Sequence, residues 1–464
     1  MGADADLYNV CAQTRTLMPA RLPHFVVACA ESLAAKARAP KPAAEDWTEL
    51  ARQIHAYAQA YALTAALDAG RAPRGARVAA RRAMEAFETR LLPWLASGPQ
   101  RKLALDVARA SQGTGIVIPV GTRSVPRARA AIRVLRAIGC RLPVVIAYFG
   151  DGDLAPDARK QLKRLEGVEL MDMQPLIATE GIREGWHLKP FAALVAPFRN
   201  VLLMDADALF FRPPEELVDM PQFTRTGALL FRDRTLPYGH LGTWGYGLGT
   251  LVAQIRKAFG RQPLMLADTR ITHLASAVEI DSGVVVWDKM RAMPAIMAAC
   301  LLNSDPYVTY GANKSHGDKE LIWLGHEATR LPVAAGPSNG GAIGTLTTDG
   351  AEFRVCGPLY HPGNDGRPLW INGGLGSREP VAEPKVEVPA YWAVEYDAKD
   401  VKWFLDGGFC LYGKLGNGTG TRIGGLIAEE KRIAQLMASI WREEMTLPKK
   451  LPPLTFDEDE NSTE

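Results

Sequence analysis

Apolar residues recur at helical spacing through the first part of the chain. The clearest stretches are residues 47–69 and 76–95, which are rich in Ala, Leu, Glu and Arg, residues that favour helices. Pro and Gly at 71–75 and 97–99 interrupt the pattern and predict turns between helices. We therefore predict a helical N-terminal extension over residues 1–110, whose default interpretation is a packing or acceptor-side segment without chemistry of its own.

From residue 114 the pattern changes to short apolar runs that alternate with helical stretches. In chain order they are 115–120 (strand), 127–138 (helix), 142–149 (strand), 168–171 (strand), 189–196 (helix) and 201–204 (strand). This alternation is typical of a mostly parallel sheet that helices cover on both faces. It predicts an α/β domain of the nucleotide-binding type over residues 111–376.

After residue 376 the chain becomes rich in Pro and Val and then predicts an amphipathic helix. The apolar face of this helix is formed by Leu426, Ile433, Met437, Ile440 and Trp441. Residues 377–455 are predicted to be a C-terminal extension, and 456–464 a disordered acidic tail.

Composition narrows the function classes only a little. The 464 residues include 54 basic and 51 acidic side chains, and the net charge of +3 gives no overall electrostatic footprint for nucleic acid. The six cysteines lack the paired spacing of a zinc site and do not decide the redox compartment. The most apolar N-terminal stretch, 25–35, is too short to span a bilayer and contains Glu31, so we predict neither a transmembrane segment nor a signal peptide.

Two carboxylates, Asp205 and Asp207, follow the predicted strand 201–204. They therefore stand where a buried strand ends, which is the ligand-binding edge of an open α/β sheet. In extended chain, residues i and i+2 point the same way, so both carboxylates can converge on one hard cation such as Mn²⁺ or Mg²⁺. The pattern is weak when isolated, but the strand before it and the apolar residues after it strengthen the prediction.

Two further acidic turns lie downstream. Asp281 and Gly283 precede the predicted strand 284–287, and a glycine there permits close approach of a ligand to the backbone. The second turn contains Asp318, Lys319 and Glu320 before a helical run, so Asp318 is either a functional carboxylate or a helix N-cap.

A histidine, His361, lies in a Gly- and Pro-rich turn. An imidazole suits Mn²⁺ beside two carboxylates, and tertiary folding could bring such a turn to them. The alternative is an ordinary polar surface position.

Taken together, these segments resemble glycosyltransferase family 71, the fungal-type Golgi α-mannosyltransferases, which have a GT-A fold. The matching segments, in chain order, are 135–143, 186–190, 205–207, 281–283, 317–320, His361 and 370–373. The ordered set is far more specific than any one member, and it covers roughly residues 114–376.

The resemblance implies roles for individual residues. Asp205, Asp207 and His361 would bind Mn²⁺ (or Mg²⁺), while Asp281 and Asp318 would be the catalytic carboxylates near the donor sugar. The family usually has a glutamate before its Ser-Gly pair, where this chain has Asp281, with Glu279 two residues earlier. The assignment between these two acids therefore stays open.

The same resemblance implies a nucleotide-sugar donor. Its binding residues would be Lys189, Asp205, Gly283, Lys319, Glu320 and Asn372. The implied reaction is transfer of mannose from GDP-mannose, with retention of configuration, to a hydroxyl of a glycan or glycoprotein acceptor. The family is Golgi-resident, but the helical N-terminus and the missing anchor depart from its usual architecture, so the compartment is not assigned.

Three alternatives remain from the sequence. The first is a transferase on the same scaffold that uses a UDP-sugar. The second is a non-catalytic glycan-binding protein on a degenerate GT-A fold, against which the intact acids argue. The third is a metal-dependent phosphate-ester hydrolase with similar carboxylates, which nucleotide-sugar turnover with and without acceptor would distinguish from a transferase.

Overall fold

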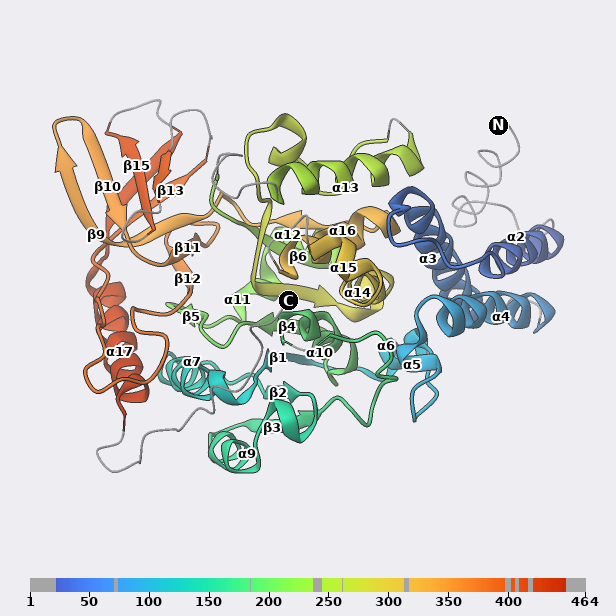
Figure 1. Cartoon of the computed structure of the whole chain (residues 1–464), viewed down its shortest axis with the longest axis horizontal. Coiled ribbons are helices and arrows are strands. Elements are labelled where there is room, and N and C mark those ends of the chain that lie inside the picture. The colour runs from blue at the N-terminus through green and yellow to red at the C-terminus, as the bar shows by residue number, and fades with distance from the viewer. Residues whose placement is uncertain are drawn as a thin grey trace, which may run out of the picture.

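The computed structural model shows a central α/β layer between a helical unit and a second sheet (Figure 1). It describes residues 22–70, 74–183, 185–236, 244–260, 262–312, 317–396, 402–404, 409–415 and 420–447. The predicted acidic tail, 456–464, lies outside these residues.

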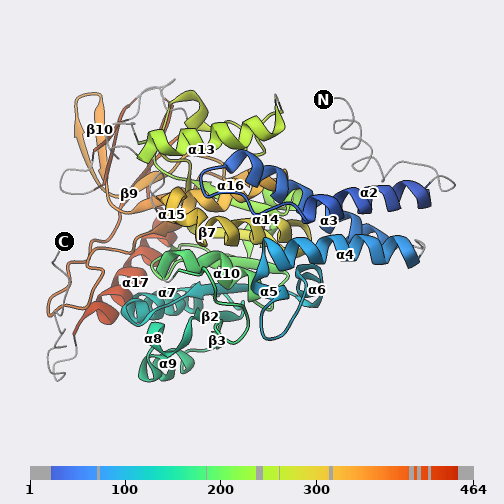
Figure 2. The same ribbon diagram turned by 45° about the vertical axis from the view of Figure 1, so that its right-hand side comes forward.

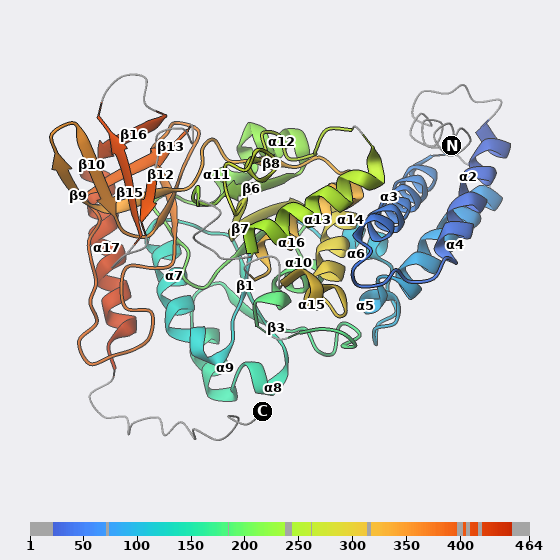
Figure 3. The ribbon, with the colours of Figure 1, turned by 45° about the horizontal axis from the view of Figure 1, so that its top comes forward.

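The first unit is helical from its first described residue. Its helices are α2 (Leu22–Ala37), α3 (Trp47–Ala69), α4 (Arg74–Arg90), α5 (Pro93–Ala96) and α6 (Ala104–Ala110). Asp46 caps α3 by accepting from the amide of Glu49. α3 also packs against α13 (Trp244–Phe259) and α16 (Lys319–Thr329), as Figures 2 and 3 show, so this unit shares a core with the α/β layer. The predicted N-terminal helices are confirmed over the described part.

The central layer is a seven-stranded sheet in the order β3-β2-β1-β4-β7-β6-β8. Its strands are β1 (Thr114–Pro119), β2 (Val144–Tyr148), β3 (Val168–Asp172), β4 (Asn200–Met204), β6 (Ala228–Arg232), β7 (Ile280–Asp288) and β8 (Ala334–Ala335). β7 runs antiparallel to both of its neighbours, and the other pairings are parallel. The predicted α/β fold with a mostly parallel sheet is therefore confirmed.

Helices cover both faces of this sheet, because its strands are apolar on both sides. One face packs against α10 (Lys189–Val195), α14 (Lys289–Leu302) and α16, and the other lies on the side of α7 (Val125–Ala137) and α17 (Ala428–Met445). The remaining helices are shorter or peripheral: α8 (Gly150–Asp153), α9 (Pro156–Lys163), α11 (Glu216–Asp219), α12 (Pro221–Thr226) and α15 (Tyr307–Ala312).

The second sheet is antiparallel and was not predicted. Its strands are β5 (Leu209–Phe210), β9 (Gly341–Asp349), β10 (Glu352–Cys356), β11 (Leu359–Pro362), β12 (Pro368–Asn372), β13 (Tyr391–Glu395), β14 (Lys402–Phe404), β15 (Cys410–Lys414) and β16 (Thr421–Gly425). β9 and β10 pair with β13 and β15, so strands from both sides of residue 376 share one sheet. Cys356 and Cys410, which face each other on β10 and β15, form a disulfide.

The two sheets are joined at the acidic triplet. β4 belongs to the central sheet and β5 to the second one, where it pairs with β12. The chain between them is Asp205-Ala206-Asp207, followed by Ala208. The predicted metal-binding motif is therefore one of the connections between the two layers. No helix within the described residues has the length and apolar character needed to cross a membrane.

Candidate active site

The acidic connection lies at the carboxyl end of β4. The amide of Asp205 donates to the carbonyl of Gly283 (2.8 Å), and the amide of Gly374 donates to the carbonyl of Asp207 (3.0 Å). β7 runs antiparallel to β4, so its first residues lie at this same edge. The backbone thus fixes the acidic turn against the start of β7 and the end of β12.

Lys189, the first residue of α10, lies among the carboxylates of this edge. Its Nζ is 2.6 Å from Oδ1 of Asp205 and 3.5 Å from Oδ2 of Asp318, and it donates to Oγ of Ser282 (3.1 Å). Burial disfavours the ammonium ion, but the carboxylates of Asp205 and Asp318 outweigh this effect and raise the pKa of Lys189 above its usual value. Lys189 is therefore a fixed positive charge between carboxylates from two different segments.

The carboxylates of this cluster are not fully neutralised. Burial, together with the charges of Asp207 and Asp318, raises the pKa of Asp205 to about 7 although Lys189 opposes the shift. Oδ2 of Asp318 is buried and makes no hydrogen bond. Carboxylates that repel one another in this way are stabilised by a divalent cation, so Asp205 and Asp207 fit a pair of ligands for Mn²⁺ or Mg²⁺. Within the described residues, no three His, Cys, Asp or Glu side chains already form a metal-binding group.

The second carboxylate centre is Asp281, at the start of β7. Its Oδ1 accepts from Nδ2 of Asn372 (2.8 Å) and from the amide of Gly283 (3.0 Å), and its Oδ2 lies 2.9 Å from Nε2 of His361. The imidazole stacks on the indole of Trp370, with ring centroids 4.2 Å apart. Asp281 is therefore held in one orientation by side chains from β11 and β12.

The predicted local structure of His361 and Gly283 is wrong: His361 lies in strand β11 and is buried rather than in a turn at the surface, and Gly283 lies within β7 rather than before the strand. The ring of His361 is directed to Asp281 in the structure, and its predicted role as a metal ligand stays a prediction. At Gly283 a Cβ atom would lie 2.5 Å from Nδ2 of Asn372. The room left by this glycine is therefore occupied by the amide that binds Asp281.

Asp318 occupies the N-cap position of α16, which was one of the two interpretations of this residue. Its side chain makes no capping hydrogen bond, however, and it pairs with Lys189 instead. It is 4 % exposed, so its carboxylate is held inside the site rather than in solvent. Asp318 therefore stands at the N-cap position without capping the helix through its side chain, and its role as a functional carboxylate stays a prediction.

Lys319 pairs with a carboxylate that the sequence analysis did not select. Its Nζ bonds to Asp233, which also accepts from the amide of Arg234 (2.7 Å). Burial opposes ionisation, but Lys319 and Arg234 hold the pKa of Asp233 well below its usual range. A signal was available, because Asp233 closely follows the apolar strand 228–231 just as Asp205 follows 201–204.

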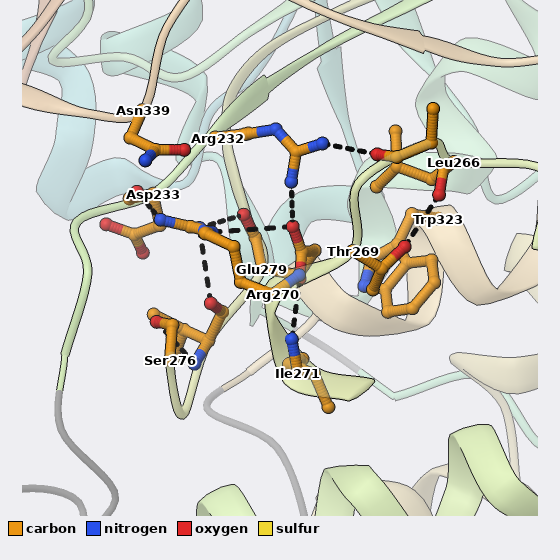
Figure 4. A network of polar contacts seen from close by, with 12 residues as sticks. Arg232, Asp233, Leu266, Thr269, Arg270, Ile271, Ser276, Glu279, Trp323 and Asn339 are labelled. Carbon is orange, nitrogen blue, oxygen red and sulfur yellow. Dashed lines mark hydrogen bonds and ion pairs between the residues drawn. The ribbon is translucent and has the colours of Figure 1, made fainter. Parts of the chain in front are cut away.

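Glu279 and Glu320 are structural neighbours of the site. Figure 4 shows Glu279 between Arg232, with which it forms a salt bridge, and Arg270, whose amide donates to it (2.7 Å). Glu320 accepts from the amide of Glu279 (2.9 Å) and from the indole of Trp323 (2.6 Å), and burial raises its pKa to about 7. Of the two acids that the sequence left open, Asp281 therefore faces the cluster, whereas Glu279 is held by arginines.

A family model described as "Mannosyltransferase putative" matches residues 113–361, which are 249 of the 464 residues. Among curated proteins, the chain is 25% identical to alpha-1,3-mannosyltransferase MNT3 of Saccharomyces cerevisiae over 304 residues, which cover 58% of this chain and 47% of the relative. It is also 25% identical to alpha-1,3-mannosyltransferase MNT2 of the same yeast, over 58% of this chain and 53% of that protein. The chain thus spans about half the length of these curated relatives.

Part of the chain is similar to solved glycosyltransferases, at low TM-scores and low sequence identity. The galactosyltransferase LgtC matches 48% of this chain and 73% of its own, with 9% identity and a TM-score of 0.32. Mouse xyloside xylosyltransferase 1 matches 49% of this chain and 85% of its own, with 13% identity and a TM-score of 0.30. At these scores no residue or reaction is carried over from them.

Proposed function

Because the chain belongs to the mannosyltransferase family that its residues 113–361 match, we propose that it transfers a mannosyl group from a nucleotide sugar to a hydroxyl of a glycan or glycoprotein. The observation that carries this proposal is the arrangement around Lys189, where Asp205 and Asp318 meet one buried ammonium ion at the ligand edge of the sheet. The 25% identity to alpha-1,3-mannosyltransferases extends the proposal to an α-linked product and a retaining reaction.

Asp205 and Asp207 would hold a divalent cation, Mn²⁺ or Mg²⁺. Bound there, the ion would supply Lewis-acid stabilisation of the charge on the departing diphosphate. The support for this assignment is the crowding of carboxylates at the turn, which one lysine only partly compensates. His361 as a further ligand is a separate proposal, because its Nε2 contacts Asp281 and the metal would have to bind through Nδ1 or displace that contact.

The chain's own residues have distinct tasks in this proposal. Lys189 would reduce the repulsion between the carboxylates of Asp205 and Asp318 and would offer a positive charge to a donor phosphate. Because its pKa is raised, it stays protonated near neutral pH. Asp318 and Asp281 would stabilise positive charge that develops on the sugar ring during transfer. His361 and Asn372 hold Asp281 in position for that task. Lys319, Glu320 and Gly283 would shape the donor site through the contacts already described.

Retention of configuration leaves two routes. Either an enzyme carboxylate attacks the anomeric carbon first, or the acceptor hydroxyl enters on the face from which the diphosphate departs. In the second route, a leaving phosphate oxygen accepts the hydroxyl proton. Asp318 or Asp281 would be the nucleophile in the first route and would only stabilise developing positive charge in the second.

The donor is proposed to be GDP-mannose, with UDP-sugars as the alternative. The test measures the melting temperature in Mn²⁺ with GDP-mannose, GDP, UDP-glucose and UDP-galactose, together with transfer of labelled mannose to α-mannobiose. A ligand at one hundred times its dissociation constant stabilises the protein by about 2.7 kcal/mol. GDP-mannose should give the largest shift, and a chelator should abolish both the shift and the transfer. A larger shift of the melting temperature with a UDP-sugar would identify that sugar nucleotide as the donor in place of GDP-mannose. Full transfer in excess chelator would refute the metal-dependent mechanism.

A further inference from the structure

Trp186 is an exception among the tryptophans of this protein. Its side chain is 63% exposed, although indole is among the largest apolar groups and gains most from burial. The other tryptophans with described side chains are at most 7% exposed: Trp47, Trp94, Trp287, Trp323, Trp370, Trp392, Trp403 and Trp441. A large apolar side chain left in solvent is informative where it adjoins a functional site.

The position of Trp186 connects it to the candidate active site from two directions. It lies in the short helix η3 (Gly185–Leu188), which leads directly into α10 and its first residue, Lys189. Its ring also lies over Gly317, where a Cβ atom would be 3.2 Å from Cε3 of the indole. Gly317 immediately precedes Asp318. The indole therefore flanks both partners of the Lys189–Asp318 ion pair.

The turn that carries Trp186 is fixed, although the indole is exposed. The next residue, His187, pairs through Nδ1 with Oδ1 of Asn303 (2.9 Å), and Leu188 is buried in the core. These contacts anchor η3 to the end of α14. An aromatic side chain on an anchored turn has few rotatable bonds, so it presents a contact surface at low cost in conformational entropy.

We propose that Trp186 is a stacking platform for a neutral pyranose ring of the acceptor. A hexopyranose carries C–H groups on its faces and hydroxyl groups around its edge, so a ring face matches an indole face while the hydroxyls stay available to polar groups. The assignment to the acceptor rests on the proposed function. In an extended nucleotide sugar the base lies across the diphosphate from the sugar, so an aromatic ring beside Asp318 is at the sugar-transfer end.

The kinetic test compares Trp186→Ala, Trp186→Phe and the control Tyr391→Ala, which removes an aromatic ring that is 41% exposed on β13. With α-mannobiose as acceptor, Trp186→Ala should raise the acceptor KM at least tenfold, because base–aromatic stacking lost on alanine substitution has an effect of that size. Trp186→Phe should retain most of the affinity. The donor KM and the rate of donor hydrolysis without acceptor should stay within twofold of wild type in all three variants. An unchanged acceptor KM in Trp186→Ala would overturn the platform.

A binding test needs no catalysis. Acrylamide should quench part of the tryptophan fluorescence of the wild type, and that part should be missing in Trp186→Phe. α-Mannobiose should protect it, whereas GDP and UDP should not. Protection by the nucleotides alone would overturn the proposal and assign the ring to the donor base.

The two tests also distinguish failure of this proposal from failure of the proposed function. Protection by α-mannobiose without turnover of any nucleotide sugar would refute the transferase and support the platform. Turnover with no protection, and with the same acceptor KM in Trp186→Ala, would support the transferase and refute the platform.

Discussion

Two acidic stretches, Asp205–Asp207 and Glu279–Asp281, lie at the same edge of the central sheet. The carboxylates of Asp205 and Glu279 differ in the groups that compensate their charge. Glu279 is fully buried and is bound by Arg232 and by the amides of Arg270 and Ile271. The side chain of Asp205 is 22% exposed and pairs with Lys189, but Asp207 and Asp318 lie near it, and burial together with these carboxylates raises its pKa to about 7.

The difference separates a carboxylate whose charge is compensated inside the fold from the carboxylates that we propose to be metal ligands. A buried carboxylate with two arginines and amide donors is satisfied internally, and its removal harms the fold. A carboxylate among other acids is less well compensated, and a further positive charge stabilises it. The candidate site is therefore distinguished by carboxylate charge that nearby positive groups do not fully compensate, and not simply by acidic residues in a turn.

The largest effect is expected from Asp207→Ala. Loss of a ligand to the proposed cation removes several kcal/mol of transition-state stabilisation, and about 4 kcal/mol corresponds to a thousandfold lower kcat/KM. The melting temperature should not fall, because like-charge repulsion at the turn is relieved. Transfer of labelled mannose in Mn²⁺ measures the first quantity and a thermal melt the second.

The control for this substitution is Asp349→Ala, at an exposed position of β9 in the second sheet. It should leave both activity and melting temperature unchanged. Activity of Asp207→Ala within tenfold of wild type would contradict the proposed distinction, because Asp207 would then not be needed for catalysis.

Glu279→Gln should act on the fold instead. Removing one partner of a buried ion pair leaves Arg232 without its counter-charge, which costs about 3 kcal/mol of the free energy of unfolding. The amide of Gln keeps an acceptor for the backbone donors, so the lower end of the usual range is expected. Denaturant unfolding monitored by fluorescence measures the loss.

An exposed glutamate of the second sheet, Glu352, provides the matched control. Glu352→Gln should change the free energy of unfolding by less than about 0.5 kcal/mol. Equal stabilities of the two variants would contradict a structural role for Glu279, and loss of Mn²⁺-dependent donor binding with intact stability would place it in the site.

Lys289 shows that an uncompensated buried charge also occurs away from the site. It is fully buried, and its Nζ donates to the carbonyls of Leu194 (2.9 Å) and Ala196 at the end of α10. Burial lowers its pKa to about 7, whereas the unfolded chain keeps the proton up to about pH 10.4. Between these values the unfolded state binds more protons, so this lysine makes stability rise with pH.

Substitution of Lys289 by Met removes that titration. The stability of Lys289→Met relative to wild type should therefore decrease as the pH rises from 7 towards 9, by up to about 1.4 kcal/mol for each pH unit. Melts of both proteins over this interval measure the difference at each pH. Parallel stability curves would mean that Lys289 keeps its proton in the folded protein.

The parts of the fold that the sequence predicted are those with local signals. The strands around 115–120, 144–148 and 201–204 are continuous apolar runs, and their order along the chain implies a parallel sheet. Strand β9, by contrast, is buried in its first half and largely exposed in its second, and its partners β10, β11 and β13 come from later segments. Such pairing leaves little periodicity for a sequence to reveal.

The candidate site divides in the same way. Asp205 could be found because it ends an apolar strand, and Asp233 could have been found by the same rule. The choice between Glu279 and Asp281 could not be made, because it depends on Arg232 and on His361, which distant segments bring to these acids. Charge compensation depends on the folded chain, so the sequence around Glu279 and Asp281 does not show which of the two acids is bound by arginines.

The smallest effect concerns His361, for which the sequence and the geometry predict different results. If the ring orients Asp281, as the 2.9 Å contact and the stacking on Trp370 indicate, His361→Ala should lower kcat about tenfold, which is the effect of losing a residue that orients a ligand or catalytic group. The Mn²⁺ concentration for half-maximal activity should then stay within twofold of wild type. If the ring instead binds the metal with Asp205 and Asp207, that concentration should rise at least tenfold, and excess Mn²⁺ should restore part of the activity. Asn372→Ala removes the other side-chain contact of Asp281 and serves as the matched control, because it should lower kcat without moving the Mn²⁺ curve. Mn²⁺ titrations of the wild type and both variants therefore decide the role: we expect superimposable midpoints, and a shift confined to His361→Ala would make this histidine a metal ligand.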